Sequence, residues 1–208
     1  MRVIAIDGPA GSGKSTVAKR VAEKLGLAYL DTGAMYRSVA FAALRRGLDV
    51  SDAEAVGRLA HQVEMEIGAT VRVDGVDATV EIRGPDVTRA VSVVAANPDV
   101  RAEMVRRQRD WVSIRDGAVV EGRDIGSVVF PNAELKVFLT AGDEERARRR
   151  SQEMLDLDYD TVAADIARRD LLDSTRQTSP LVVAEDAVVI DTTGRSVEEI
   201  VEEVLAQL

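Results

Sequence analysis

The sequence contains no cysteine, which excludes a disulfide framework and a zinc site built on thiolates. No apolar stretch reaches about 18 residues and no signal-peptide pattern precedes the first apolar run, so we expect a cytoplasmic protein without a membrane partner. Basic residues are scarce relative to acidic ones, giving a net charge of −9. This balance argues against a nucleic-acid partner, because affinity for DNA or RNA comes largely from Lys and Arg on phosphates.

What the sequence does contain is a set of short apolar runs separated by helical patterns. Its 208 residues suit one α/β domain with a small insert. The runs at 2–7, 28–31, 118–120, 135–139 and 187–190 read as buried strands. Five such strands with intervening helices predict an α/β fold of the P-loop NTP hydrolase type. In this fold a five-stranded parallel sheet has helices on both faces.

Two segments depart from this alternation of strand and helix. Residues 63–67, 71–73 and 80–82 alternate apolar and polar side chains around Asp74-Gly75, which predicts a small antiparallel insert. A charge-dense helical stretch runs from about 144 to 172. We therefore expect core segments at 1–61, 98–143 and 173–208, an insert at 62–97 and a separate helical segment at 144–172. Capping boxes beginning at Ser51 and Ser196 predict two helix starts, and the second helix has an apolar face extending to Leu208.

The first strand leads directly into a phosphate-binding motif. The sequence Gly8-Pro-Ala-Gly-Ser-Gly-Lys-Ser-Thr16 fits G-x-x-x-x-G-K-[ST] between a strand and a helix. Glycines allow backbone N–H groups to turn toward a phosphate, and the helix N-terminus favours negative charge. Lys14 can reach the β- and γ-phosphates, and the Ser15 hydroxyl can ligate Mg²⁺. The sequence therefore predicts ATP and Mg²⁺ as ligands, held by Gly8, Pro9, Ala10, Gly11, Ser12, Gly13, Lys14, Ser15 and Thr16.

Two further motifs follow predicted strands, at the sheet edge where ligands bind in open α/β folds. Asp31-Thr-Gly-Ala-Met-Tyr-Arg37 can hold a second anion, or it can be a capped helix with a surface arginine. Glu121-Gly-Arg-Asp-Ile-Gly126 places Arg123 for a bidentate phosphate contact and Asp124 for hydrogen bonds from a base or sugar. Its alternative reading is an ion pair within a turn.

Arginines gather in two more places. Arg146, Arg149 and Arg150 share a helix face and can stabilise a transferring phosphoryl group, or they can form a solvated face with Glu144 and Glu145. A second group before the last strand contains Arg168, Arg169, Asp173 and Arg176, and the same two readings apply. The sequence has no Asn-Lys-x-Asp motif for guanine, which disfavours a GTPase switch.

Taken together, these motifs resemble the bacterial-type cytidylate kinases, nucleoside monophosphate kinases related to the adenylate kinases. The resemblance covers essentially the whole chain. It rests on residues 6–15, on Leu30-Asp-Thr-Gly-Ala-Met-Tyr-Arg37, on Gly122-Arg-Asp-Ile-Gly126 with Val128-Val-Phe-Pro131, and on Glu145-Arg146 continuing into the arginine run. It implies a core, a lid bearing arginines at 144–172 and an antiparallel insert that helps to hold CMP.

The resemblance also assigns roles to residues. It implies that Lys14 and the lid arginines Arg146, Arg149 and Arg150 are catalytic. It implies that CMP is bound by Thr32, Tyr36, Arg37, Ser92, Arg101, Arg123, Asp124, Arg169, Asp173 and Arg176, with Ser92 and Arg101 matching groups that read the cytosine ring. Leu172 and Ser174 stand where some relatives add arginines, so the anion site is expected to be less charged.

The reaction implied is ATP + CMP or dCMP → ADP + CDP or dCDP, in pyrimidine metabolism. The acceptor phosphate is already anionic and needs no general base, which agrees with the absence of histidine from every motif. Two alternatives stay open at this stage: another small-molecule P-loop kinase, with UMP, shikimate or a sugar acid as acceptor, and a nucleotide-binding switch without turnover. No exposed apolar stripe is evident in the pattern, and a monomer is expected.

Overall fold

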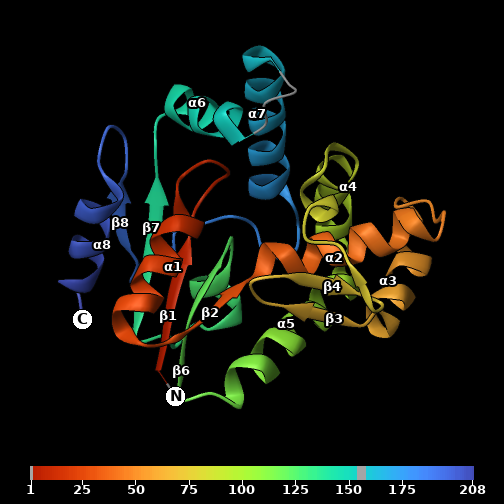
Figure 1. The fold of residues 1–208 in the computed structure, drawn as a ribbon, viewed down its shortest axis with the longest axis horizontal. Coiled ribbons are helices and arrows are strands. Elements are labelled where there is room, and N and C mark those ends of the chain that lie inside the picture. Colours follow the sequence, from red (N-terminus) through yellow and green to blue (C-terminus); the bar gives the residue numbers. More distant parts are fainter. Residues whose placement is uncertain (1, 154–157) are drawn as a thin grey trace. The chain divides into compact units, whose positions relative to one another are not determined.

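The computed structural model describes residues 2–153 and 158–208, which form two compact units. Unit 1 comprises Met1–Tyr29 and Arg115–Leu208, and unit 2 comprises Leu30–Ile114 (Figure 1). The predicted insert at 62–97 lies wholly within unit 2, together with the flanking residues 30–61 and 98–114. Among the described residues, no helix is long and apolar enough to span a bilayer.

The main sheet contains five strands in the order β2-β6-β1-β7-β8. Their bounds are β1 Arg2–Asp7, β2 Ala28–Asp31, β6 Gly117–Gly122, β7 Leu135–Thr140 and β8 Val188–Asp191. β1 pairs in parallel with both β6 and β7, and β7 with β8, so the predicted parallel sheet is confirmed. The chain leaves β1 toward β2 and leaves β6 toward β7, in opposite directions along the sheet. The carboxyl ends of β1 and β6 therefore mark the switch point at which such sheets bind ligands.

Two helices cover one face of this sheet, α1 (Lys14–Leu25) and α8 (Val197–Leu205). Ile4, Ile6 and Val137 on the strands pack against Val21 of α1 and Val201 of α8 in one buried cluster. The capping box at Ser196 is confirmed. The predicted apolar face is wrong at its end, because Leu208 lies beyond α8 and is 45% exposed.

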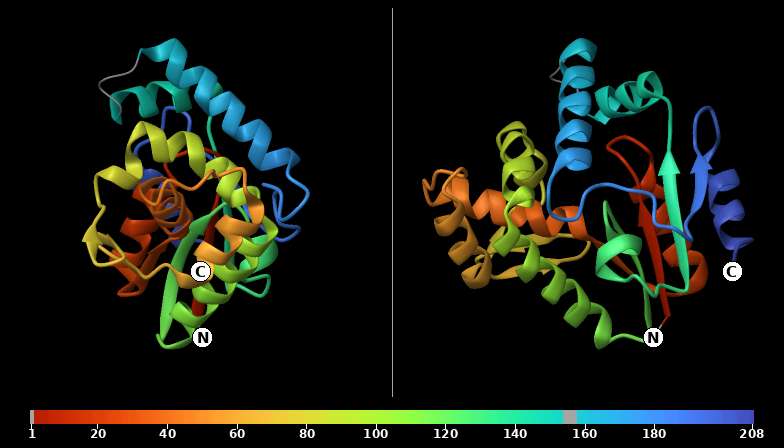
Figure 2. Two further views of the ribbon diagram at one scale, coloured as in Figure 1. Left: turned by 90° about the vertical axis from the view of Figure 1, so that its right-hand side faces the viewer. Right: turned by 180° about the vertical axis from the view of Figure 1, so that it is seen from behind.

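Unit 1 also carries a single turn of π-helix, η2 (Ile125–Val129), and the helices α6 (Asp143–Glu153) and α7 (Tyr159–Thr175). α6 and α7 lie side by side (Figures 1 and 2). The predicted lid at 144–172 includes most of both helices, and its positions 154–157 lie outside the described residues.

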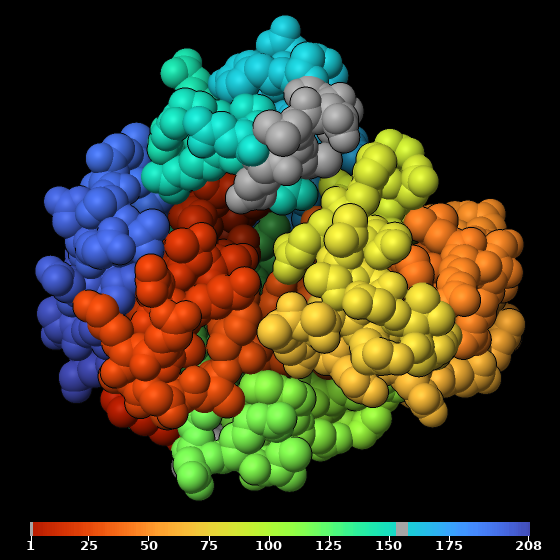
Figure 3. All heavy atoms as spheres, viewed as in Figure 1, coloured from red at the N-terminus to blue at the C-terminus, as the bar shows by residue number. Residues whose placement is uncertain are grey.

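Unit 2 is built from four helices and a small sheet. The helices are α2 (Thr32–Arg45), α3 (Ala53–Gln62), α4 (Pro85–Ala96) and α5 (Pro98–Ser113). α2 contacts α4, and α3 contacts α5. The segment from the small sheet to α4, yellow in Figure 3, forms much of the face that unit 2 presents in that view. Side chains cap the helices that matter below: Asp31 accepts from Ala34 N at the start of α2, and Asn97 accepts from Asp99 N at the start of α5.

The small sheet corrects one sequence prediction. Its antiparallel strands are β3 (Met65–Ile67), β4 (Val71–Val73) and β5 (Val76–Asp77), whereas residues 81–83 form a 3₁₀ turn, η1 (Glu81–Arg83). Asp74 and Gly75 both have positive φ, and such a tight hairpin turn starts its return strand at the next residue, Val76. The expected strand at 80–82 was therefore wrong.

A second correction concerns the start of α3. The N-cap is Asp52, whose carboxylate accepts from Ala55 N, and not Ser51. The Ser51 hydroxyl instead donates to the carboxylate of Asp49 at 2.7 Å. A neighbouring acid thus engages Ser51 in the preceding turn, and the cap moves one residue along the chain.

Candidate active site

The phosphate-loop motif forms the connection between β1 and α1. At Gly8 an added Cβ would lie 2.2 Å from the carbonyl oxygen of Leu139, and at Gly11 one would lie 2.7 Å from that of Arg146. Only glycine fits either position. Gly13 precedes α1 in the left-handed conformation and supplies no side-chain cap to the helix N-terminus. The Lys14 ammonium donates to the carbonyl of Pro9 at 3.0 Å, so it lies over its own loop.

A buried carboxylate lies beside the end of this loop. The Ser15 hydroxyl donates to Glu121 Oε2 at 2.8 Å, and the Tyr29 hydroxyl contacts Glu121 Oε1. Glu121 stands on β6, next to β1 in the sheet, and is only 2% exposed. Glu121 lies within one of the predicted motifs, but its role was not predicted from the sequence. An acidic residue ending an apolar run was the available signal, and its value depended on knowing that β6 neighbours β1.

The turn after β6 is fixed by the last residue of β1. The Asp7 carboxylate accepts from the backbone N–H groups of Ile125 and Gly126, each at 2.8 Å. Burial raises the pKa of Asp7 to about 6, against the lowering effect of these two hydrogen bonds. This arrangement places Arg123 and Asp124 at the switch point of the sheet, as the motif predicts.

Arg123 and Asp124 belong to a charged cluster with the end of α7. Arg123 Nε donates to Asp173 Oδ2 at 2.9 Å, and Arg176 lies 3.7 Å from Asp173 and 3.8 Å from Asp124. Burial raises the pKa of Asp173, but the guanidinium groups of Arg123, Arg176 and Arg169 together outweigh that effect, so the pKa is lowered. These ion pairs join the turn after β6 to the end of α7, whereas the alternative reading of the sequence was an ion pair within the turn.

Arg169 adds a further positive charge to this cluster. Its Nε is buried and has no hydrogen-bond partner among the described residues. Burial, followed by the neighbouring Arg123, lowers the pKa of Arg169 to about 10. Asp173 and Asp170 act in the opposite direction, so Arg169 lies among charges of both signs. Leu172 and Ser174 are exposed.

The lid arginines differ in their surroundings. Arg146 is almost fully buried, donates to Ala10 O at 3.1 Å, and pairs with Asp143 and Asp170. This side chain therefore ties α6 and α7 to the phosphate loop.

Arg149 donates to Glu145 and makes two hydrogen bonds to Thr192, whose own hydroxyl donates to Ser12 O at 3.2 Å. Arg150 contributes positive charge near Arg169. Arg148, which we assigned no role, forms an exposed pair with Glu145.

The remaining predicted residues gather in unit 2. Thr32, Tyr36 and Arg37 lie in the first turns of α2, Ser92 on α4 and Arg101 on α5, and all five are buried. The Arg101 guanidinium lies over the Tyr36 ring, 5.4 Å from its centre, and donates to Ala95 O. Arg37 Nη1 donates to Ile82 O and to Thr88 Oγ1, each at 2.9 Å.

The predicted site residues thus form two sets, each assembled within its own unit. The set in unit 1 is the phosphate loop with Arg123, Asp124, Arg146, Arg149, Arg150, Arg169, Asp173 and Arg176. The set in unit 2 is Thr32, Tyr36, Arg37, Ser92 and Arg101.

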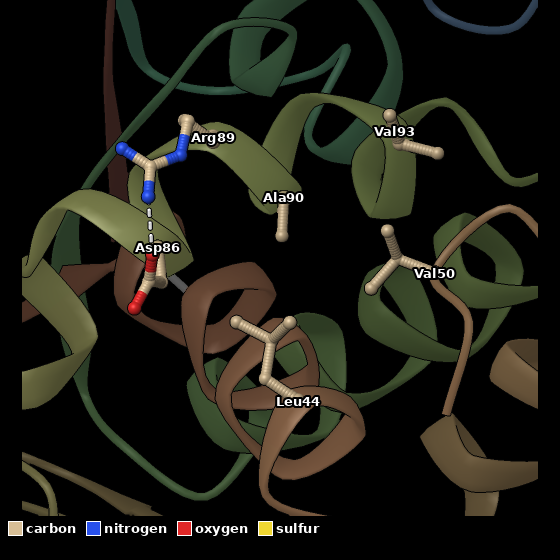
Figure 4. Close-up of a pocket in the computed structure, with 6 residues that line it drawn as sticks. All are labelled: Leu44, Val50, Asp86, Arg89, Ala90 and Val93. Atoms are coloured by element: carbon tan, nitrogen blue, oxygen red, sulfur yellow. Dashed lines mark hydrogen bonds and ion pairs between the residues drawn. The ribbon is translucent and has the colours of Figure 1, made fainter. Parts of the chain in front are cut away.

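A shallow pocket in unit 2 contains none of these residues. It has a volume of about 510 Å³ and is lined by Leu44, Val50, Ala90 and Val93 beside an ion pair of Asp86 with Arg89 (Figure 4). The pair joins neighbouring turns of α4, and the other lining groups are apolar.

A parallel sheet with this loop, a carboxylate beside its serine and an arginine cluster at the switch point defines a P-loop phosphotransferase. A family model for cytidylate kinase matches residues 4–208, and the chain belongs to that family. It is 51% identical to the cytidylate kinase of Mycolicibacterium paratuberculosis, with coverage of 96% of this chain and 92% of that protein. It is 53% identical to that of Geobacillus kaustophilus, with coverage of 97% and 94%.

Among solved structures, an uncharacterized protein from Eubacterium ventriosum matches all of this chain and 98% of its own with a TM-score of 0.57. At 12% identity this likeness concerns the fold alone.

Proposed function

We propose that this protein transfers the γ-phosphoryl group of ATP to the phosphate of CMP or dCMP, giving ADP and CDP or dCDP. Membership of the cytidylate kinase family supports the reaction. The structural observation that carries the proposal is the cluster of Arg123, Arg169 and Arg176 at the switch point. The buried Nε of Arg169, which has no hydrogen-bond partner among the described residues, is in this proposal available to a bound anion.

The donor nucleotide is assigned to the phosphate loop. Gly8–Thr16 surround the position that the β- and γ-phosphates of ATP would take, with Lys14 as the cation and the N-terminus of α1 as a further electrostatic contribution. Arg146 fixes the base of the lid to this loop through Ala10. In this proposal Arg149 and Arg150 neutralise charge on the transferring group and help to exclude water.

The residues present also suit Mg²⁺. The Ser15 hydroxyl and the Glu121 carboxylate lie 2.8 Å apart at the end of the loop, and both are oxygen ligands of the kind that Mg²⁺ prefers. When bound with ATP, the ion neutralises charge on the β- and γ-phosphates. We assign Ser15 to the ion directly and Glu121 to the ion or to a water molecule bound to it.

The acceptor nucleotide is assigned to both sets of residues. Arg37, Arg123 and Arg176 are proposed to orient the acceptor phosphate, with Arg169 and Asp173 supporting them. Asp124, Ser92 and Arg101 are proposed to contact the cytidine, with Tyr36 and Thr32 lining its site. A cytosine amino group needs acceptors where uracil needs donors, so correctly placed oxygens discriminate strongly between the two bases.

The chemistry requires little beyond positioning. The acceptor phosphate is a competent nucleophile without a general base, and the transition state is loose and in line. Holding both phosphates against arginines offsets their mutual repulsion. The catalytic groups proposed are therefore cations, Lys14 with Arg146, Arg149 and Arg150.

The test is an ADP-release assay with a panel of acceptors. CMP and dCMP should be phosphorylated far better than UMP or AMP, and shikimate and sugar acids should give no turnover above background. Preference for any of those other acceptors would overturn the substrate assignment. ATP binding without turnover on any acceptor would instead favour a nucleotide-binding switch.

A further inference from the structure

A threonine outside the predicted site holds the side chain of Arg37. Arg37 and Thr88 are 8% and 5% exposed, and Arg37 Nη1 donates to Thr88 Oγ1 at 2.9 Å. The same nitrogen donates to the carbonyl of Ile82 at 2.9 Å. A guanidinium is a rigid planar fork, so fixing one terminal nitrogen against two acceptors largely sets its orientation.

The hydroxyl of Thr88 is itself oriented. An arginine only donates, so Thr88 must accept from Arg37, and its own proton is directed elsewhere. The carbonyl of Arg83 lies 3.4 Å from Thr88 Oγ1 and receives that proton. Because the Thr88 hydroxyl donates its proton to the carbonyl of Arg83 in η1, its oxygen lone pair is left to accept from Arg37.

The other end of this arrangement reaches the start of α2. Arg83 Nη2 pairs with Asp31 Oδ2 at 3.0 Å, while Asp31 Oδ1 accepts from Ala34 N at 2.9 Å. Asp31 thus caps the helix that carries Arg37 and at the same time binds the residue whose carbonyl orients Thr88. The network thus joins η1 and the first turn of α4 to the N-terminal part of α2. Asp31 makes the contact at one end and Arg37 at the other.

We propose that Thr88 is a positioning residue for the acceptor site, acting through Arg37. Its hydroxyl holds the guanidinium in one orientation before CMP arrives, so the acceptor phosphate meets a preorganised arginine. The inference rests on the proposed function, in which Arg37 binds the acceptor phosphate. Valine at this position would keep the shape of threonine and remove the hydrogen bond, whereas serine would keep the hydroxyl.

The experiment compares Thr88→Val with Thr88→Ser in the full-length enzyme. Thr88→Val is expected to raise the KM for CMP about tenfold, the size expected for losing a hydrogen bond to a charged group, and to leave the KM for ATP within about twofold. Thr88→Ser, which keeps the hydroxyl, is expected to have a KM for CMP within about threefold of the parent. Direct titration of CMP by calorimetry, without ATP, should show the same loss and the same rescue.

A double-mutant cycle with Arg37→Ala separates the possible failures. If Arg37→Ala leaves the KM for CMP unchanged, the proposed acceptor site is wrong. If Arg37→Ala raises that KM but Thr88→Val does not, the positioning role of Thr88 is wrong.

The role is supported if Thr88→Val has less than about a twofold effect when Arg37 is already alanine. An undiminished effect in that background, or an equal rise in both KM values, would make the role of Thr88 structural and overturn the inference. If the valine variant does not fold, a serine variant with a parent-like KM supports the role, and one with a KM raised about tenfold overturns it.

Discussion

The chemistry at the end of the phosphate loop depends on individual side chains whose neighbours differ widely. Lys14 lies over Pro9, whereas Ser15 is joined to a carboxylate on the adjacent strand. Lys24, near the end of the same helix, is exposed. Substitutions of Lys14 and Lys24 should therefore have very different effects on turnover and similar, small effects on folding.

Lys14→Ala is expected to lower kcat by orders of magnitude because it removes the cation closest to the donor phosphates. The fold should persist, since Lys14 lies outside the buried apolar core. Steady-state kinetics with circular dichroism measure both effects. Lys24→Ala is the matched control and should retain parent activity, and an active Lys14→Ala enzyme would contradict the donor-site assignment.

Glu121→Gln is expected to raise the Mg²⁺ concentration needed for half-maximal activity by about tenfold or more, because it removes a charged oxygen beside Ser15. Titration of activity against Mg²⁺ at saturating ATP and CMP measures this shift. Glu134→Gln, which affects only a partly exposed pair with Arg2, should leave the Mg²⁺ curve in place. If the Mg²⁺ titration curves of the two variants were identical, the assignment of Glu121 to the Mg²⁺ site would be wrong.

At the scale of elements, α3 and α5 are fastened together by a buried acid and one arginine. Glu103 on α5 pairs with Arg106 and Arg107, each at 2.6 Å. Arg107 then donates to the carbonyls of Ala60, His61 and Val63, which end α3. The hydrogen bond from Arg106, joined by that from Arg107, overcomes the effect of burial and lowers the pKa of Glu103 to about 2.

This pKa predicts how stability depends on pH. A carboxyl group with a lowered native pKa stabilises the fold above its unfolded value near 4.5 and loses that contribution as the pH falls toward 2. Glu103→Gln should therefore lower the unfolding free energy by about 2 kcal/mol at pH 7 and flatten its decline in acid.

Urea denaturation at several pH values measures this effect. Glu54→Gln, in an exposed pair with Arg58, should change the unfolding free energy by less than about 0.5 kcal/mol. A parent–mutant difference for Glu103→Gln that stays constant from neutral pH to pH 2.5 would contradict the assignment.

The elements also indicate how far sequence reasoning extends. The strands of the main sheet and the phosphate loop were predictable because apolar runs and loop glycines act locally. The segment at 80–82 was not, since Val80 and Ile82 alternate as in a strand although Val80 is 78% exposed and only Ile82 is buried. The role proposed for Glu121 was not predicted, because it depends on β6 lying beside β1, and strand order is not a local property of the sequence.

At the scale of the whole molecule, the residues assigned to ATP and those assigned to CMP should give separate responses to the two nucleotides. Binding of a ligand to the native state raises the unfolding free energy by mass action, by roughly 2.7 kcal/mol when the ligand is at a hundred times its Kd. The melting temperature rises as a result. For a chain of this size that corresponds to roughly 5–10 °C. Both CMP and a non-hydrolysable ATP analogue should therefore stabilise the protein.

Variants should separate the two responses. Lys14→Ala is expected to lose most of the shift with the ATP analogue and keep the shift with CMP, while Arg37→Ala should do the reverse. Thermal scanning with each nucleotide alone measures both. Loss of both shifts in either variant, with its melting temperature unchanged in the absence of nucleotide, would contradict the separate assignment of Lys14 to ATP and Arg37 to CMP.

The glycines of the phosphate loop have a meaning for descent as well as for binding. Gly8 has no room for a methyl group because the carbonyl of β7 lies against it, and Gly11 is equally confined by the backbone of α6. Both would therefore be retained by a descendant that had lost its nucleotide, since the packing of the loop demands them. In such descendants the glycines would indicate common ancestry only. The presence of Lys14 would be the better indicator that kinase activity is retained.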